Sequence, residues 1–156
     1  MYGATSGEVY ICGQVGERFA VRNSGANAVI EGAGDHCCEY MTGGRVAVLG
    51  SVGVNFGAGM SGGIAYVLDE NNNFDEFCNL DMLDLDLLQT PEDIAELRAI
   101  IEAHWKYTGS EKAESILKNW ESSVPLFVKV FPIEYKKILG QMMKEDAEIK
   151  RMAAHD

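Results

Sequence analysis

The chain has 156 residues, of which 47% are hydrophobic and 24% charged, so it can bury a core and we do not expect it to be disordered. Its net charge of −11, without a Lys/Arg cluster, argues against nucleic acid or anionic lipid as a partner. No secretory signal pattern and no apolar run of about 18 residues occurs, so no secretion or membrane span is indicated and a cytoplasmic location is expected.

Composition divides the chain into two parts. Fifteen of the 17 glycines lie before residue 64, and all eight lysines lie after it. We expect residues 1–69 to form glycine-repeat coils. Residues 70–156 are expected to supply an acidic arm, a helical hairpin and a C-terminal tail that pack on the coils, so that both parts make one structural domain.

The first part contains an internal repeat. Four similar segments begin with glycine at residues 7, 25, 44 and 63, and these starts differ by 18 or 19 residues. Aligned from their ends, the segments form two apolar columns that share one face of each predicted strand. A coil of about 19 residues cannot bury that face alone, so the coils must stack, which predicts a parallel β-helix. The columns are Val9, Ala28, Val46, Ala65 and Ile11, Ile30, Val48, Val67.

Each coil is predicted to hold a strand, a glycine corner, a second strand and another corner. Glycine at the corners meets the need for positive φ and for close approach between stacked backbones. A left-handed hexapeptide β-helix, as in certain acyltransferases, is an alternative, because Val9, Val15 and Val21 keep a six-residue step. That step then reaches Asn27, and the period slips to 19.

Residues 57–62 match the dinucleotide-binding pattern GxGxxG. That pattern must open a helix whose N-terminus holds the pyrophosphate. Residues 64–68 are instead strand-like, so the motif is predicted to be a corner of the solenoid.

Four cysteines are too few for a disulfide scaffold, and we expect reduced, partly buried thiols at Cys12, Cys37, Cys38 and Cys78. Cys37 and Cys38 are expected on opposite faces of a strand. A metal site at residues 35–39 is the alternative. Neighbouring side chains on an extended backbone do not converge on one ion, and no CxxC motif completes a tetrahedral site.

Residues 69–89 mix turn formers with acids and predict an irregular arm. Asp81, Asp84 and Asp86 are interpreted as a solvated acidic edge rather than a cation site, because no EF-hand spacing is present.

Two helices are predicted next. Thr90 and Ser110 are the expected N-caps, and Gly109 the expected C-cap of the first helix. His104 lies on the buried side of the first helix and is expected to be packed and hydrogen-bonded rather than catalytic. The expected buried stripes are Leu97, Ile101 and Trp105 in the first helix and Ala113, Ile116, Leu117 and Trp120 in the second. A strand at 126–131 and a last helix from Ile133, with Tyr135, Ile138, Leu139 and Met142 on its apolar side, complete the chain, with residues 144–156 frayed.

Six segments closely resemble the C-terminal glycine-repeat (GXGXG) domain of the glutamate synthase large (alpha) subunit. The resemblance runs from about residue 3 to residue 140. Formylmethanofuran dehydrogenase has a related glycine-repeat subunit, but the helical hairpin and the Phe-Val-Lys-Val segment favour the synthase. The matching segments are 18–25, 34–36, 38–44, 55–56, 59–63 and 127–132.

The resemblance implies a flavin enzyme that converts glutamine and 2-oxoglutarate to two glutamates. In such an enzyme this chain would have as partners a glutaminase domain, a central domain and a barrel that carries FMN and an iron-sulfur cluster. In that family the C-terminal domain is a right-handed parallel β-helix that braces the catalytic domains. The resemblance therefore assigns no catalytic, cofactor-binding or metal-binding residue to this chain. The sequence departs from the family pattern at Cys37, Val54 and Gly57, and it does not tell which electron donor the parent enzyme uses.

The sequence pattern also indicates no catalytic or cluster-binding site, because no Ser/His/Asp, Cys/His or iron-sulfur pattern has suitable spacing. A stand-alone acyltransferase or sugar-acting β-helix would have to use His36 with Asp35 and Glu39, the only histidine and nearby acids on the solenoid. The chain begins inside a repeat, so we expect a fragment, a split-gene subunit or a truncated form.

Overall fold

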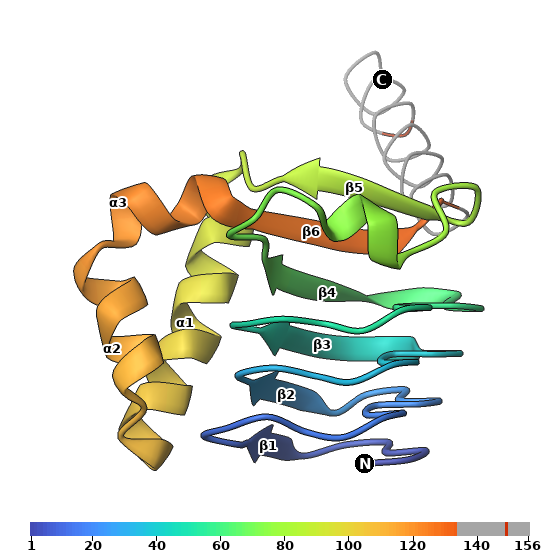
Figure 1. The fold of residues 1–156 in the computed structure, drawn as a ribbon, viewed down its shortest axis with the longest axis horizontal. Coiled ribbons are helices and arrows are strands. Elements are labelled where there is room, and N and C mark those ends of the chain that lie inside the picture. Colours follow the sequence, from blue (N-terminus) through green and yellow to red (C-terminus); the bar gives the residue numbers. More distant parts are fainter. Residues whose placement is uncertain (134–148, 150–156) are drawn as a thin grey trace.

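The computed structural model describes residues 1–133 and residue 149. Six strands form one sheet in the order β1-β2-β3-β4-β6-β5. The first four are parallel, and each belongs to one coil of a stack (Figure 1). They are β1 (Glu8–Tyr10), β2 (Asn27–Ile30), β3 (Thr42–Val48) and β4 (Gly62–Leu68). The predicted mainly β, solenoid-like stack is confirmed.

The register of the stack is the one that the apolar columns predict. Val9 pairs with Ala28, Ala28 with Val46, and Val46 with Ala65. In the second column, Ile30 pairs with Val48, which pairs with Val67. Both columns pack into one hydrophobic core inside the coils. Within residues 1–68, each coil contributes one strand to this ladder, without the further strands that a hexapeptide coil requires.

The glycine corners allow the coils to approach closely. A Cβ atom on Gly43 would lie 2.2 Å from the carbonyl oxygen of Ser24, and one on Gly62 would lie 2.2 Å from that of Thr42. The next residues, Gly44 and Gly63, have φ values of 87° and 81°. The corners therefore require glycine for both predicted reasons. Residues 57–62 lead into β4 rather than into a helix, so their interpretation as a corner is confirmed.

The prediction of a second strand in each coil is wrong. Residues 17–22 and 35–40 are turns in which alternate residues have positive φ, for example Arg18, Ala20 and Arg22 at 62°, 60° and 56°. Such values are unfavourable for L-residues, by roughly 1–2 kcal/mol each. Hydrogen bonds between coils offset this strain, because Arg18 N donates to Asp35 O and Arg22 N to Glu39 O, both at 2.8 Å.

A second hydrophobic core lies between the outer face of the sheet and the helices. The strand residues that alternate with the inner columns, among them Val29, Ala47 and Tyr66, pack there with Leu97 and Ile101. The sheet is therefore buried on both faces, as parallel sheets usually are.

The three predicted helix caps, Thr90, Gly109 and Ser110, are confirmed. In α1 (Pro91–Thr108), the Thr90 side chain accepts a hydrogen bond from Asp93 N, and Gly109 ends the helix with φ 69°. In α2 (Glu111–Lys118), the Ser110 side chain accepts one from Ala113 N. Short helical segments follow at α3 (Trp120–Ser123) and η2 (Val124–Leu126). None of the helices among the described residues is long and apolar enough to cross a membrane.

The buried stripe of α1 differs from the prediction at one position. Trp105 is 44% exposed, whereas Leu97, Ile101 and His104 are fully buried. At 3.6 residues per turn, His104 lies within about 20° of Leu97 around the helix, while Trp105 lies about 80° away. The indole therefore points along the side of α1 instead of into the sheet.

The predicted irregular arm contains the short helix η1 (Phe74–Phe77) and a strand, β5 (Leu83–Leu87). β5 pairs antiparallel with β6 (Phe127–Pro132), which in turn pairs antiparallel with β4. Leu83 and Leu85 pack against the inner core, so the alternating Leu-Asp sequence is a half-buried strand. The strand predicted at 126–131 is confirmed. The predicted last helix and frayed end fall outside the described residues, apart from Ile133 and Ile149.

Candidate functional site

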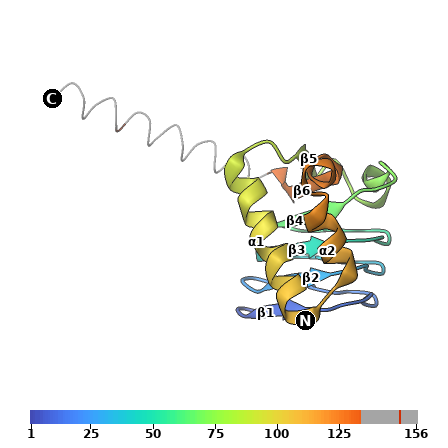
Figure 2. The same ribbon diagram turned by 90° about the vertical axis from the view of Figure 1, so that its left-hand side faces the viewer.

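Helix α1 runs across the strands of the stack rather than along them (Figure 2). It contacts β1, β2 and β3. One helical turn rises about 5.4 Å and neighbouring strands are about 4.8 Å apart, so the helix meets roughly one strand per turn. Polar side chains tie α1 to the sheet near each of its ends.

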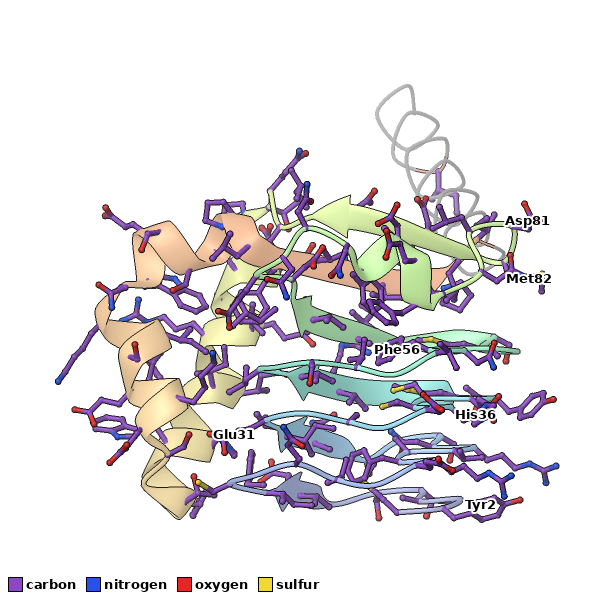
Figure 3. All side chains as sticks on the ribbon, in the orientation of Figure 1. Tyr2, Glu31, His36, Phe56, Asp81 and Met82 are labelled. Atoms are coloured by element: carbon purple, nitrogen blue, oxygen red, sulfur yellow. The ribbon has the colours of Figure 1, made fainter. Side chains whose placement is uncertain are left out.

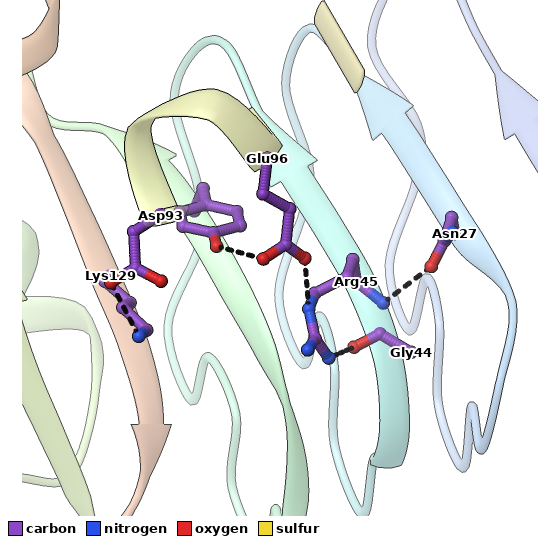
Figure 4. Close-up of polar contacts among 7 residues, drawn as sticks. Asn27, Gly44, Arg45, Asp93, Glu96 and Lys129 are labelled. Carbon is purple, nitrogen blue, oxygen red and sulfur yellow. Dashed lines mark hydrogen bonds and ion pairs between the residues drawn. The ribbon is translucent and has the colours of Figure 1, made fainter. Parts of the chain in front are cut away.

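Near the start of α1, Glu96 accepts hydrogen bonds from two strands (Figure 4). Arg45 Nε on β3 donates to Glu96 Oε1, and the Tyr66 hydroxyl on β4 donates to Glu96 Oε2 at 3.2 Å. Burial and the nearby carboxylates raise the pKa of Tyr66, which keeps its hydroxyl a donor. In the same region Lys129 Nζ on β6 lies 2.9 Å from Asp93 Oδ2. Together these contacts join α1 to three strands.

Near the end of α1, the helices are tied to the sheet by Glu31, the residue that follows β2. Ser110 Oγ donates to Glu31 Oε1 at 2.5 Å while also accepting the amide of Ala113 that caps α2. His104 Nε2 lies 4.0 Å from the same Glu31 oxygen. The expectation that His104 is packed is confirmed. The expected hydrogen bond is wrong, because neither ring nitrogen has a partner among the described residues. Burial lowers the pKa of His104.

The alternative site comprises Asp35, His36 and Glu39, and its His36 lies on the opposite side of the stack from Glu31 (Figure 3). His36 Nδ1 lies 3.0 Å from Glu39 Oε2, and Asp35 Oδ1 accepts the amide of Val54 at 2.9 Å. The structure thus brings His36 and Glu39 together, whereas Asp35 binds the backbone of the next coil. The contact of His36 with Glu39 holds a single turn, and that of Asp35 links this turn to the next coil.

All four cysteines are free thiols, of which Cys12 is exposed, Cys78 half-buried and the other two buried. Cys37 and Cys38 were predicted on opposite faces of a strand, which is wrong: both are buried in the same core, with their sulfur atoms 3.7 Å apart. The reason is that Cys38 has a φ of 61° and the segment is a turn. Hydrogen bonding to Cys37 and burial raise the pKa of Cys38, and burial raises that of Cys78 to about 11.

Within the described part of the chain, no three His, Cys, Asp or Glu side chains gather as they would around a metal ion. An open cavity of about 580 Å³ beyond the ends of β3 and β4 is lined by Glu31, Asp69, Glu70 and Lys112, among others. Lys112 pairs with Glu70 at 2.6 Å, and Asp69 accepts the amides of Asn73 and Phe74. The charged groups of this cavity therefore hold its own walls together.

Sequence reasoning missed the joints between α1 and the sheet. A period of two places Arg45 and Tyr66 on the outer face, so the strand half of the signal is present in the sequence. Their partner Glu96 lies 51 residues beyond Arg45, and nothing local connects the two.

Comparison with known proteins places this architecture in a family. A family model described as "GXGXG motif" matches residues 1–133. The chain is 57% identical over 147 residues to the glutamate synthase (NADPH) large chain of Bacillus subtilis, with 94% of this chain and 10% of the relative covered. It is 53% identical over 152 residues to the glutamate synthase (NADH) of Schizosaccharomyces pombe, covering 97% of this chain and 7% of that one.

The ferredoxin-dependent glutamate synthase of Spinacia oleracea is 46% identical over 156 residues, covering 96% of this chain and 10% of the relative. The chain thus spans 7–10% of the length of these relatives. The chain belongs to the GXGXG-motif family, and it matches the region of that family found in glutamate synthases.

Proposed function

We propose that this chain is a non-catalytic scaffold domain of a glutamate synthase, an enzyme that forms two glutamates from glutamine and 2-oxoglutarate. The observation that carries the proposal is the shared region itself. Identity stays at 46–57% across relatives whose names specify NADPH, NADH or ferredoxin. A region shared by all three kinds of enzyme has a role that does not depend on the electron donor. A structural role has this property.

The contacts of the described residues support a bracing role. The partly buried charges of Arg45, Glu96, Asp93 and Lys129 are used in joints between α1 and the sheet. Charged groups in an enzyme site are expected to face a substrate cavity instead. The partners in this proposal are the glutaminase, central and FMN-barrel domains of the parent enzyme.

The side chains of the described residues do not fit the cofactors of the parent enzyme. An iron-sulfur cluster takes thiolates that converge on it, whereas Cys37 and Cys38 are buried side by side in an apolar core and the pKa of Cys38 is raised. The glycine pattern at 57–62 leads into a strand and so offers no helix N-terminus to a flavin phosphate. We therefore assign FMN and the iron-sulfur cluster to other domains.

The proposal extends to the architecture. The coils wind in the right-handed sense, α1 and α2 act as one helical hairpin, and residues 1–69 and 70–156 form one structural domain in a cytoplasmic enzyme. The pairing of β6 with β4 and the contacts of α1 with β1, β2 and β3 support a single unit.

The test is reconstitution. The chain purified alone is expected to be colourless and to form no glutamate, and a glutamate synthase lacking this region is expected to regain activity when the chain is added. A flavin spectrum or turnover from the chain alone would contradict the proposal. Asp35, His36 and Glu39 would then be the residues to substitute.

A further inference from the structure

A groove lies on the outer side of the two long helices, away from the sheet. Its larger hollow, of about 580 Å³, is lined by Arg98, Glu102, Trp105, Lys106 and Leu117. A smaller hollow of about 220 Å³ adjoins it through Trp105 and Leu117, and is completed by Glu114 and Lys118. We call this the α1–α2 groove. It follows two helices that lie side by side along the stack (Figure 2).

The floor of the α1–α2 groove is apolar. Trp105 leaves 44% of its surface exposed, although the same helix buries Leu97 and Ile101 completely against the sheet. Tryptophan is among the residue types enriched at the centres of protein interfaces, where a large indole fills a pocket at low entropic cost. Helix α1 thus presents one apolar face to the sheet and a second apolar feature to the outside.

The rim of the groove is positively charged, in contrast to the chain as a whole. Arg98 pairs with Glu102, and Lys118 pairs with Glu114, both at 2.9 Å. Lys106 is then the basic residue in excess, which makes the rim net positive on a chain of net charge −11. Charges further away than about 8 Å are largely screened at physiological ionic strength, so an approaching group responds mainly to the rim. The complementary partner carries carboxylates.

We propose that the α1–α2 groove binds an amphipathic helix from the part of the glutamate synthase polypeptide that lies outside this chain. Its apolar side chains pack on Trp105 and Leu117, and a flanking Asp or Glu residue pairs with Lys106. Two parallel walls with an apolar floor suit a third helix laid between them. This inference rests on the proposed function, and the matched relatives are about ten or more times longer than the region shared with this chain, which leaves ample sequence to supply the helix.

The first test is zero-length carbodiimide cross-linking of the complete glutamate synthase polypeptide, read by mass spectrometry. We expect amide cross-links from Lys106 or Lys118 to Asp or Glu residues outside this domain, within a segment of helical spacing. Lys112, which pairs with Glu70 away from the groove, is the internal comparison. Cross-links from the groove lysines only within this domain, or only between groove peptides of two copies, would overturn the proposal.

The second test measures binding of the chain to the remainder of the polypeptide. Trp105→Ala is expected to weaken binding at least tenfold, and the charge reversal Lys106→Glu to weaken it with a reduced salt dependence. Leu126→Ala is the matched control, because Leu126 is 42% exposed and lies outside the groove. Circular dichroism melts establish that each variant is folded.

The outcomes separate the two proposals. If the wild-type chain binds and both groove variants bind equally well, the groove inference fails and the scaffold function stands. If the wild-type chain does not bind the remainder at all, the scaffold function fails.

Discussion

Four glycines allow the two demands of the coil corners, close approach and positive φ, to be separated by alanine substitution. Gly16 has neither demand: its φ is not positive and a Cβ there would meet nothing within 4 Å. Gly109 has a φ of 69° but the same open space. Gly43 has only the close approach to Ser24 O, and Gly44 combines a φ of 87° with a Cβ position 2.3 Å from Ala26 O.

The expected free-energy changes follow from these geometries. Gly16→Ala should be neutral or stabilise by up to about 1 kcal/mol, because it restricts the unfolded chain. Gly109→Ala should destabilise by about 1 kcal/mol through backbone strain alone. At Gly43 the Cβ-to-oxygen distance must grow from 2.2 to at least 3.0 Å, which pushes two coils apart. Such overpacking costs about 1–3 kcal/mol, and Gly44→Ala adds strain to it, for about 2–5 kcal/mol.

The assay is urea unfolding followed by far-UV circular dichroism. With a slope of about 2 kcal/mol per molar urea, a 3 kcal/mol loss lowers the midpoint by about 1.5 M. The predicted order of midpoints is Gly16→Ala highest, then Gly109→Ala, Gly43→Ala and Gly44→Ala. If Gly43→Ala and Gly16→Ala unfold at the same urea concentration, close approach between coils does not explain the glycine repeat.

Three further predictions concern the joints and the thiols. Glu96→Gln should lower the free energy of unfolding by about 1–2 kcal/mol, because it weakens the hydrogen bond from Arg45. Glu102→Gln, on the exposed face of α1, should change it by less than about 0.5 kcal/mol. Equal effects of the two substitutions in urea titrations would refute this. Because burial lowers the pKa of His104 below 6.5, only the unfolded state gains its proton as the pH falls below that value, so stability should decline there by up to about 1.4 kcal/mol per pH unit. His104→Phe should reduce that slope, and an unchanged slope between pH 7 and pH 5 would count against the assignment. A thiol reagent should modify exposed Cys12 in the native protein and residues 37–38 only after unfolding; rapid native labelling of the pair would contradict their burial.

The sequence alone was sufficient for the features that depend on short-range rules. Side chains in a strand alternate with a period of two, so the columns through Val46 and Val48 predicted the register between coils. Thr90 and Ser110 marked helix starts because an N-cap acts on amides two or three residues away.

Other features were decided by tertiary structure. The Leu-Asp alternation at 83–87 becomes a strand because β6, more than 40 residues later, provides its hydrogen-bonding partner. Ala20 keeps a positive φ only because hydrogen bonds between stacked coils hold its turn, so no propensity rule predicts it. Ser110 and Glu31 meet across 79 residues of chain. The joints of this molecule are non-local in this sense: each needs the coils already stacked and α1 already placed across them, and a sequence pattern read within one segment does not contain that information.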